Sequence, residues 1–335
     1  MSGRPSVRYP KEPLVTRLGY QIPNFTYPNT SNDDIFGRVV AQAKAAEEAG
    51  FDRVFVMDHF YQLPGIGAPG EPMFECYTML SALAQHTKKV RLCALVTGNT
   101  YRHPTLLAKA VTALDHVSGG RATLGIGAGW FELEHQSLGF EFGTFTDRFE
   151  KLEESLQIIK PMLDGESVTI EGKHYQVNDA VNSPAPISKI PIMIGGSGEK
   201  KTLRMVAQYA DESNLSSGGA DEIPRKLDAL EEHCGRLGRD RSEIKVTKLT
   251  MCLVAPTMEA ADADLREIAE VKGWDEATME FAKMVLIYGD PDTVGEKLQA
   301  LVDTGLDGLT INLPGNGHKL ERIHLLGEIA DKALG

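Results

Sequence analysis

The chain has 335 residues, of which 42% are hydrophobic and 24% charged, a composition typical of a globular protein with a large buried core. Its formal net charge of -12 at pH 7 argues against a nucleic-acid binder, because such proteins need clustered Lys and Arg. No stretch approaches the ~18 apolar residues of a membrane span, and the N-terminal segment MSGRPSVRYPKEP lacks the apolar core of a signal peptide. We therefore expect a cytoplasmic protein that binds neither nucleic acid nor membrane.

The cysteines are not spaced like metal ligands. Cys93 and Cys252 lie in apolar runs, where a free thiol behaves as a small hydrophobic side chain. The other two are Cys76 and Cys234. We expect free thiols, a reducing compartment and no bound metal.

Strand-like and helix-like runs alternate along the chain. Strands are predicted at residues 17–23, 51–60, 90–98, 121–129, 189–196, 211–216, 244–255 and 307–314. Helices are predicted between Ser31 and Gly50 and at about 74–86, 104–118, 146–163, 199–209, 222–237, 259–284 and 319–333, with a further helix from Asp290-Pro291. Residues 166–180 break this rhythm and predict a polar hairpin around Glu171-Gly172.

Eight strands, each followed by a helix and without a linker of biased composition, predict a parallel (β/α)8 TIM barrel that forms one domain over residues 1–335. An open doubly wound sheet is the alternative, but it would have to arrange eight long crossovers on two faces. In a barrel the functional groups lie at the carboxyl ends of the strands.

The fourth predicted strand ends in GIGAGW, residues 125–130. A dinucleotide-binding loop would carry a third glycine where this chain has Trp130. We therefore interpret the glycines as a flat strand end that lets a ligand ring approach the backbone closely.

The predicted strand ends are rich in glycine and neutral hydrogen-bonding residues, which suits a large, flat, polar cofactor. His59 is the one histidine placed to donate or accept a proton at neutral pH, although a histidine beside Asp58 could also be purely structural. The segment IGGSGEKKTL, residues 194–203, predicts a glycine loop followed by a helix, which favours a phosphate but also occurs as an ordinary turn.

Taken in order, the segments MDHF, LVTGNTYRHP, SGGRATLGIGAGWFELEH, IGGSGEKKTL and GDPDTVGEKLQAL resemble the luciferase-like flavin and deazaflavin oxidoreductases over about residues 17–330. The resemblance is greatest to the branch that uses coenzyme F420. It implies a homodimeric barrel with an insertion between strands four and five, at residues 166–188 near the active site. It also implies a non-proline cis peptide at Leu95-Val96 and a deazaflavin ring over the strand ends.

The resemblance makes His59 the candidate proton donor and implies a set of cofactor contacts. These are Asp58, His59, Leu95, Val96, Thr97, Asn99, Gly127, Ala128, Gly129, Trp130, Gly195, Gly196, Ser197 and Gly198. Candidates for pairing with the anionic tail of the coenzyme are Arg102, Lys200, Lys201 and Arg204. Sugar-phosphate dehydrogenases of this family carry a glutamate where this chain has Ala128, which argues against a hexose-phosphate substrate.

The leading hypothesis is therefore a coenzyme F420-dependent oxidoreductase that moves a hydride between the deazaflavin and a small organic substrate of unknown identity. One alternative is a luciferase-like monooxygenase that depends on reduced FMN. Another is a barrel that binds a cofactor without catalysis.

Overall fold

The computed structural model describes residues 18–335, so the N-terminal segment in which we expected no signal peptide lies outside the described residues. Eight parallel strands form a ring in which each pairs with the next, and pairing of the last with the first closes the barrel. They are β1 (Leu18–Ile22), β2 (Arg53–Val56), β3 (Arg91–Ala94), β5 (Ala122–Gly127), β8 (Ile192–Gly195), β9 (Glu212–Leu215), β10 (Lys245–Val254) and β12 (Gly308–Asn312). The predicted TIM barrel is confirmed, and the open sheet is not formed.

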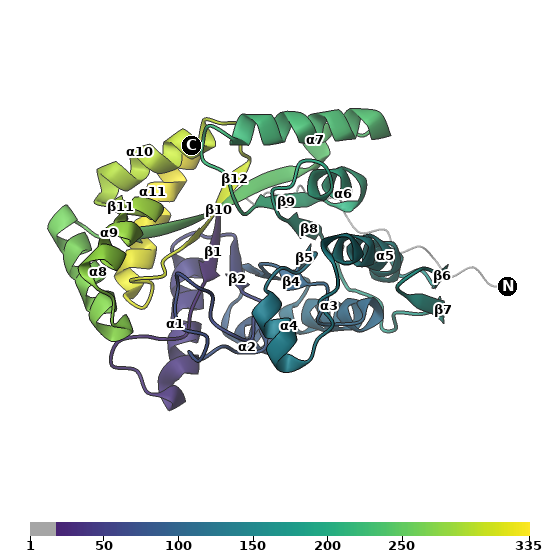
Figure 1. Ribbon diagram of the computed structural model, residues 1–335, viewed down its shortest axis with the longest axis horizontal. Helices are drawn as coiled ribbons and strands as arrows, with labels where there is room; N and C mark the ends of the chain where they lie inside the picture. The colour runs from purple at the N-terminus through teal and green to yellow at the C-terminus, as the bar shows by residue number, and fades with distance from the viewer. Residues whose placement is uncertain (1–17) are drawn as a thin grey trace.

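Helices form an outer layer around the strands (Figure 1). They include α1 (Ile35–Glu48), α2 (Cys76–His86), α3 (Pro104–Ser118), α5 (Phe145–Leu163), α6 (Thr202–Tyr209), α7 (Ile223–Leu237), α10 (Pro291–Val302) and α11 (Leu320–Leu334). The start of α10 follows from its sequence, because the Asp290 side chain accepts a hydrogen bond from the Thr293 N–H and Pro291 opens the first turn. No helix in the described part of the chain has the length and apolar character needed to cross a bilayer.

Two of the predicted elements are divided in the structure. The strand predicted at 90–98 is interrupted by a cis peptide at Leu95-Val96, as the family resemblance implied, and resumes as β4 (Thr97–Gly98). The helix predicted at 259–284 is two helices, α8 (Met258–Lys272) and α9 (Glu276–Val285), because Gly273 ends α8 with a φ of 66°.

Some short elements were not predicted, and the helix predicted from residue 199 begins later than expected. The short helix α4 (Glu132–Leu138) follows β5, and β11 (Ile287–Gly289) pairs with the end of β10. The helix predicted from residue 199 begins at Thr202, so the glycine loop extends to Lys201.

The hairpin predicted at 166–180 is present as the antiparallel strands β6 (Val168–Glu171) and β7 (Gln176–Ala180). In Figure 1 it lies beside α5, on the opposite side of the molecule from α8 and α9. The Asn182 amide that follows it donates a 2.8 Å hydrogen bond to Thr112 on α3. We expected residues 166–188 near the active site, but they pack on the outer helices instead, because their hydrogen-bonding partners lie on α3 and α5.

A buried ion pair crosses the interior of the barrel. Arg53 on β2 donates hydrogen bonds of 2.6 and 2.8 Å to the Glu212 carboxylate on β9. These two strands are not neighbours in the ring, so the bond spans the core between them. Both residues are almost completely buried, so each charge depends on the other for compensation.

We expect Glu212→Ala to lower the free energy of unfolding by about 3–5 kcal/mol, because it leaves a buried guanidinium without its carboxylate. Urea denaturation of the purified protein measures this change. The control is Glu232→Ala, which removes a partner of Arg236 from an exposed pair on α7 and should cost less than ~1 kcal/mol. Equal losses in the two variants would contradict the proposed role of the buried pair.

Candidate active site

A cavity of about 1100 Å³ opens at the carboxyl ends of the barrel strands. Residues at or just beyond the ends of the strands border it, as expected for a barrel. Most of the predicted cofactor contacts line it: Asp58, His59, Leu95, Val96, Thr97, Gly127, Ala128, Gly129, Trp130, Gly195 and Gly196.

The other three predicted contacts do not line the cavity but form hydrogen bonds within its loops. Asn99 is buried, and its main-chain N–H donates to the carbonyl of Gly127. The Ser197 hydroxyl accepts hydrogen bonds from the N–H groups of Ser216 and Ser217, both at 3.0 Å. The carbonyl of Gly198 accepts from the N–H of a residue in α6.

His59 is oriented by a buried carboxylate that the sequence analysis missed. Its Nδ1 lies 2.9 Å from Oε2 of Glu134, a fully buried residue of α4. The same carboxylate accepts hydrogen bonds from the Tyr101 hydroxyl and from the Tyr61 N–H, the latter at 2.8 Å. The Nδ1 contact leaves Nε2 of His59 for a ligand in the cavity.

Two opposing effects act on the Glu134 carboxyl group. Burial by itself would raise its pKa, but the hydrogen bonds from His59 and Tyr101 together lower the pKa below the ordinary value of 4.5. The group is therefore a carboxylate at neutral pH, and it can stabilise a positively charged imidazole at His59.

Asp58 lies in a second pair of charges. Arg102 donates to its two carboxylate oxygens at 2.7 and 2.9 Å, and the Gly98 N–H donates to Oδ2 at 3.1 Å. Burial raises the pKa of Asp58, while Arg102 opposes that effect. Arg102 also forms an ion pair with Glu75 at 2.5 Å. Because two carboxylates already compensate its charge, Arg102 holds the strand end in place and is not available to bind the anionic tail of the coenzyme.

Val96 projects into a space that only glycines leave open. A Cβ atom at Gly195 would lie 2.7 Å from Cγ1 of Val96, and one at Gly127 would lie 2.9 Å from its Cγ2. Side chains at either position would therefore displace Val96. The glycines that we interpreted as room for a ligand ring thus also provide the seat of the cis-peptide segment.

The cavity offers a polar group without a protein partner. The Asn312 amide nitrogen donates to Gln21 at 2.6 Å, while its Oδ1 is buried and accepts no hydrogen bond. Because a buried acceptor is costly to leave unpaired, this oxygen suits a ligand N–H.

The predicted tail-binding cations differ in their surroundings. Arg204 forms an ion pair with Glu153 at 2.6 Å, whereas the Lys201 ammonium lies over the rings of Phe145 and Phe149, which line the cavity. A cation missed by the sequence analysis is the nearly buried Lys226, whose Nζ lies 3.4 Å from the carbonyl of Ser197. Lys226 lies on α7, far from the glycine loop in sequence, so no sequence motif indicates that the two are close in the fold.

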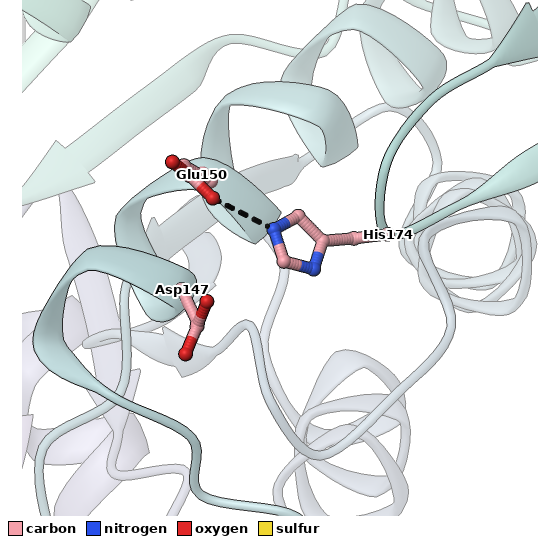
Figure 2. Close-up of side chains that lie close together, drawn as sticks. All are labelled: Asp147, Glu150 and His174. Atoms are coloured by element: carbon pink, nitrogen blue, oxygen red, sulfur yellow. Dashed lines mark hydrogen bonds and ion pairs between the residues drawn. The ribbon is translucent and has the colours of Figure 1, made fainter.

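Asp147, Glu150 and His174 form a separate cluster with atoms close enough to hold a cation (Figure 2). Glu150 on α5 accepts a 3.0 Å hydrogen bond from His174 on the hairpin and a 2.8 Å hydrogen bond from the Lys173 ammonium. The lysine thus already supplies positive charge. We interpret the cluster as an anchor that holds the hairpin on α5.

Residues 16–308 match the luciferase-like monooxygenase family. The chain is 30% identical over 306 residues to the F420-dependent glucose-6-phosphate dehydrogenase of Microbacterium testaceum, covering 84% of this chain and 89% of the relative. It is 30% identical over 297 residues to the enzyme of the same name from Nakamurella multipartita, covering 82% and 86%.

Solved structures share the fold. The coenzyme F420-dependent tetrahydromethanopterin reductase of Methanopyrus kandleri superposes with a TM-score of 0.75 at 21% identity, over 96% of this chain and 99% of that one. The monooxygenase RslO1 of Streptomyces bottropensis gives a TM-score of 0.80 at 18% identity, over 95% and 100%.

We expect Glu134→Gln to weaken the acid dependence of stability. A carboxylate whose pKa is lower in the folded than in the unfolded chain stabilises the fold above its unfolded pKa, and this contribution is lost as the pH falls through the folded pKa. The free energy of unfolding of E134Q should therefore fall less steeply than that of the wild type between about pH 5 and pH 3.

Urea denaturation at a series of pH values measures this slope. Glu132→Gln on the same helix is the matched control, because Glu132 is exposed, and it should keep the wild-type slope. An E134Q slope equal to that of the wild type would mean that the Glu134 hydrogen bonds do not stabilise its ionised form.

Proposed function

The chain belongs to the luciferase-like monooxygenase family, and from that membership we propose that it is an oxidoreductase that uses coenzyme F420. The relatives at 30% identity are named for F420 dependence, which supports the cofactor predicted from the sequence. The observation in the structure that supports the proposal most is the convergence of His59 with the glycine strand ends on one cavity.

The cavity residues fit a flat deazaflavin. Gly127 and Gly195 carry no side chains, so nothing from these two residues projects from the strand ends toward a bound ring. Val96 packs against both glycines. The unpaired Oδ1 of Asn312 provides an acceptor for an N–H of the heterocycle. Lys201, at the end of the glycine loop, supplies positive charge for an anionic tail. Lys226 on α7 lies beside the carbonyl of Ser197 but already pairs with Glu222 at 3.4 Å and Glu199 at 3.8 Å.

When bound, coenzyme F420 supplies hydride transfer at C5 of its deazaflavin ring. The chain supplies binding, orientation and a proton path. Glu134 holds Nδ1 of His59, so that Nε2 accepts or donates the proton that balances the hydride. The ring centroids of Trp130 and Phe131 each lie 5.8 Å from that of His59, and both rings pack edge-on against it.

The reduced-FMN monooxygenase is the second candidate function. Its support is the fold itself, since the monooxygenase RslO1 superposes over nearly the whole chain. The relatives at higher sequence identity favour the deazaflavin. The remaining alternative is a barrel that binds a cofactor without catalysis, and in it His59 would be a purely structural residue. The contact of Nδ1 with Glu134 argues against this alternative, because it leaves Nε2 of His59 available at the cavity.

We further propose a cytoplasmic homodimer. The four cysteines, all in the described part of the chain, are free and buried, as expected in a reducing compartment. Two-fold dimers are the most common assemblies of soluble proteins, and the family resemblance implies one.

The cofactor can be identified by fluorescence, because the chain has two tryptophans and both line the cavity. In Trp274→Phe, Trp130 at the strand ends is the remaining reporter. We expect F420 to quench its fluorescence saturably, with higher affinity than FMN or reduced FMN. Tight binding of reduced FMN without binding of F420 would reverse the assignment in favour of the monooxygenase.

We expect His59→Ala to lower turnover by about 100-fold, the usual effect of losing a general acid or base, while the affinity for F420 changes little. Turnover is followed by the absorbance of F420 with a substrate that the wild type converts. His324→Ala, at an exposed position on α11, is the control and should keep wild-type turnover. Wild-type turnover in H59A would make His59 a structural residue.

A further inference from the structure

The cavity extends from the strand ends into a region bordered by the end of β10 and by α8, α9 and the turn between them. We term this region the apolar chamber and define it by Leu253, Leu265, Ile268, Trp274, Phe281 and Val285. Leu253, Leu265 and Ile268 belong to a hydrophobic cluster separate from the main core of the barrel. The chamber thus has its own packed wall, built after residue 250.

The two cationic side chains that line the cavity are both held by protein groups, and they lie on different helices. Lys272, at the end of α8, forms a 2.7 Å ion pair with Glu71, and its side chain is only 3% exposed. Arg148 donates hydrogen bonds to the carbonyls of Gly129 and Gly143. Among the described residues that line the cavity, these are the lysine and the arginine. Of the two, Lys272 belongs to α8, which borders the apolar chamber, and Glu71 already neutralises its charge. Arg148 belongs to α5 and is held beside the end of β5 by its bond to Gly129.

These two features select between classes of substrate. A phosphorylated sugar would lose its hydration in the chamber and find no cation in return, which is unfavourable. A hydrocarbon gains affinity by leaving water, by about fourfold for each methylene group that is buried.

We propose that the substrate is an alcohol or carbonyl compound with an extended, uncharged apolar body that fills the apolar chamber. Its reacting carbon lies at the His59 end of the cavity. This inference rests on the proposed function, because the coenzyme is the partner in the redox step.

The reaction balances as a two-electron transfer. In the oxidising direction the carbon–hydrogen electron pair of the alcohol leaves as a hydride to oxidised F420, and the hydroxyl proton passes to Nε2 of His59 while the carbon–oxygen double bond forms. In the reducing direction, reduced F420 would give the hydride to the carbonyl carbon and be oxidised, while the carbonyl oxygen receives the proton from Nε2 of His59. The apolar chamber only binds and orients the body of the substrate.

Binding without turnover tests the inference directly. In Trp130→Phe, the remaining tryptophan is Trp274 in the chamber wall. We titrate this variant, free of cofactor, with unbranched primary alcohols from butan-1-ol to decan-1-ol and with glucose 6-phosphate. The dissociation constant should fall by about fourfold for each added methylene, and glucose 6-phosphate should leave the fluorescence unchanged.

A matched pair of variants on α9 tests the location. Phe281 lines the cavity, whereas Met284 on the same helix does not, and both are exposed enough for truncation to leave the fold intact. We expect Phe281→Ala, made in the Trp130→Phe background, to weaken decan-1-ol binding by at least about threefold. Met284→Ala in that background should bind decan-1-ol as before.

The outcomes separate this inference from the proposed function. Affinity that does not rise with chain length, or saturable binding of glucose 6-phosphate, would overturn the apolar substrate even if F420 binds normally. Equal effects of F281A and M284A would overturn the chamber as its site. If the alcohols bind as expected but F420 does not, the chamber stands as a binding site and the proposed redox function is wrong.

Discussion

The buried carboxylate of Glu134 joins segments that meet only in the folded chain. It accepts hydrogen bonds from His59 and Tyr61 after β2 and from Tyr101 after β4, while its own backbone belongs to α4. A charge in this position must be fully satisfied, because burial alone would favour its neutral form. The geometry of His59, and with it the proposed proton transfer, therefore depends on this one residue.

The fold was predictable to a large extent because its signals are local. Each barrel strand is a short apolar run followed by an amphipathic helix, and such units place themselves in a parallel sheet. The errors occur where tertiary structure divides a continuous pattern. The cis peptide at Leu95-Val96 splits one strand, and Gly273 splits one long helix into α8 and α9. The pairing of β11 with β10 depends on contacts that the sequence pattern does not contain.

The site was predictable where its residues lie at strand ends, as for His59, Gly127 and Gly195. It was not predictable where function depends on a partner distant in sequence. Glu134 lies on a helix too short to give a clear periodicity, and its carboxylate looked like an ordinary charge in FELEH. The sequence made Arg102 a candidate for binding the anionic tail of the coenzyme, but in the fold it forms ion pairs with Asp58 and Glu75.

The two ends of the cavity are encoded in different parts of the chain. The strand ends beneath the proposed coenzyme come from residues 57–130 and 195–216 together with Asn312, whereas the residues that define the apolar chamber lie between Leu253 and Val285. Substitutions in α8 and α9 can therefore alter which molecule is accepted without disturbing the redox chemistry. Such a division means that a change of specificity would require substitutions in only one contiguous stretch of the chain.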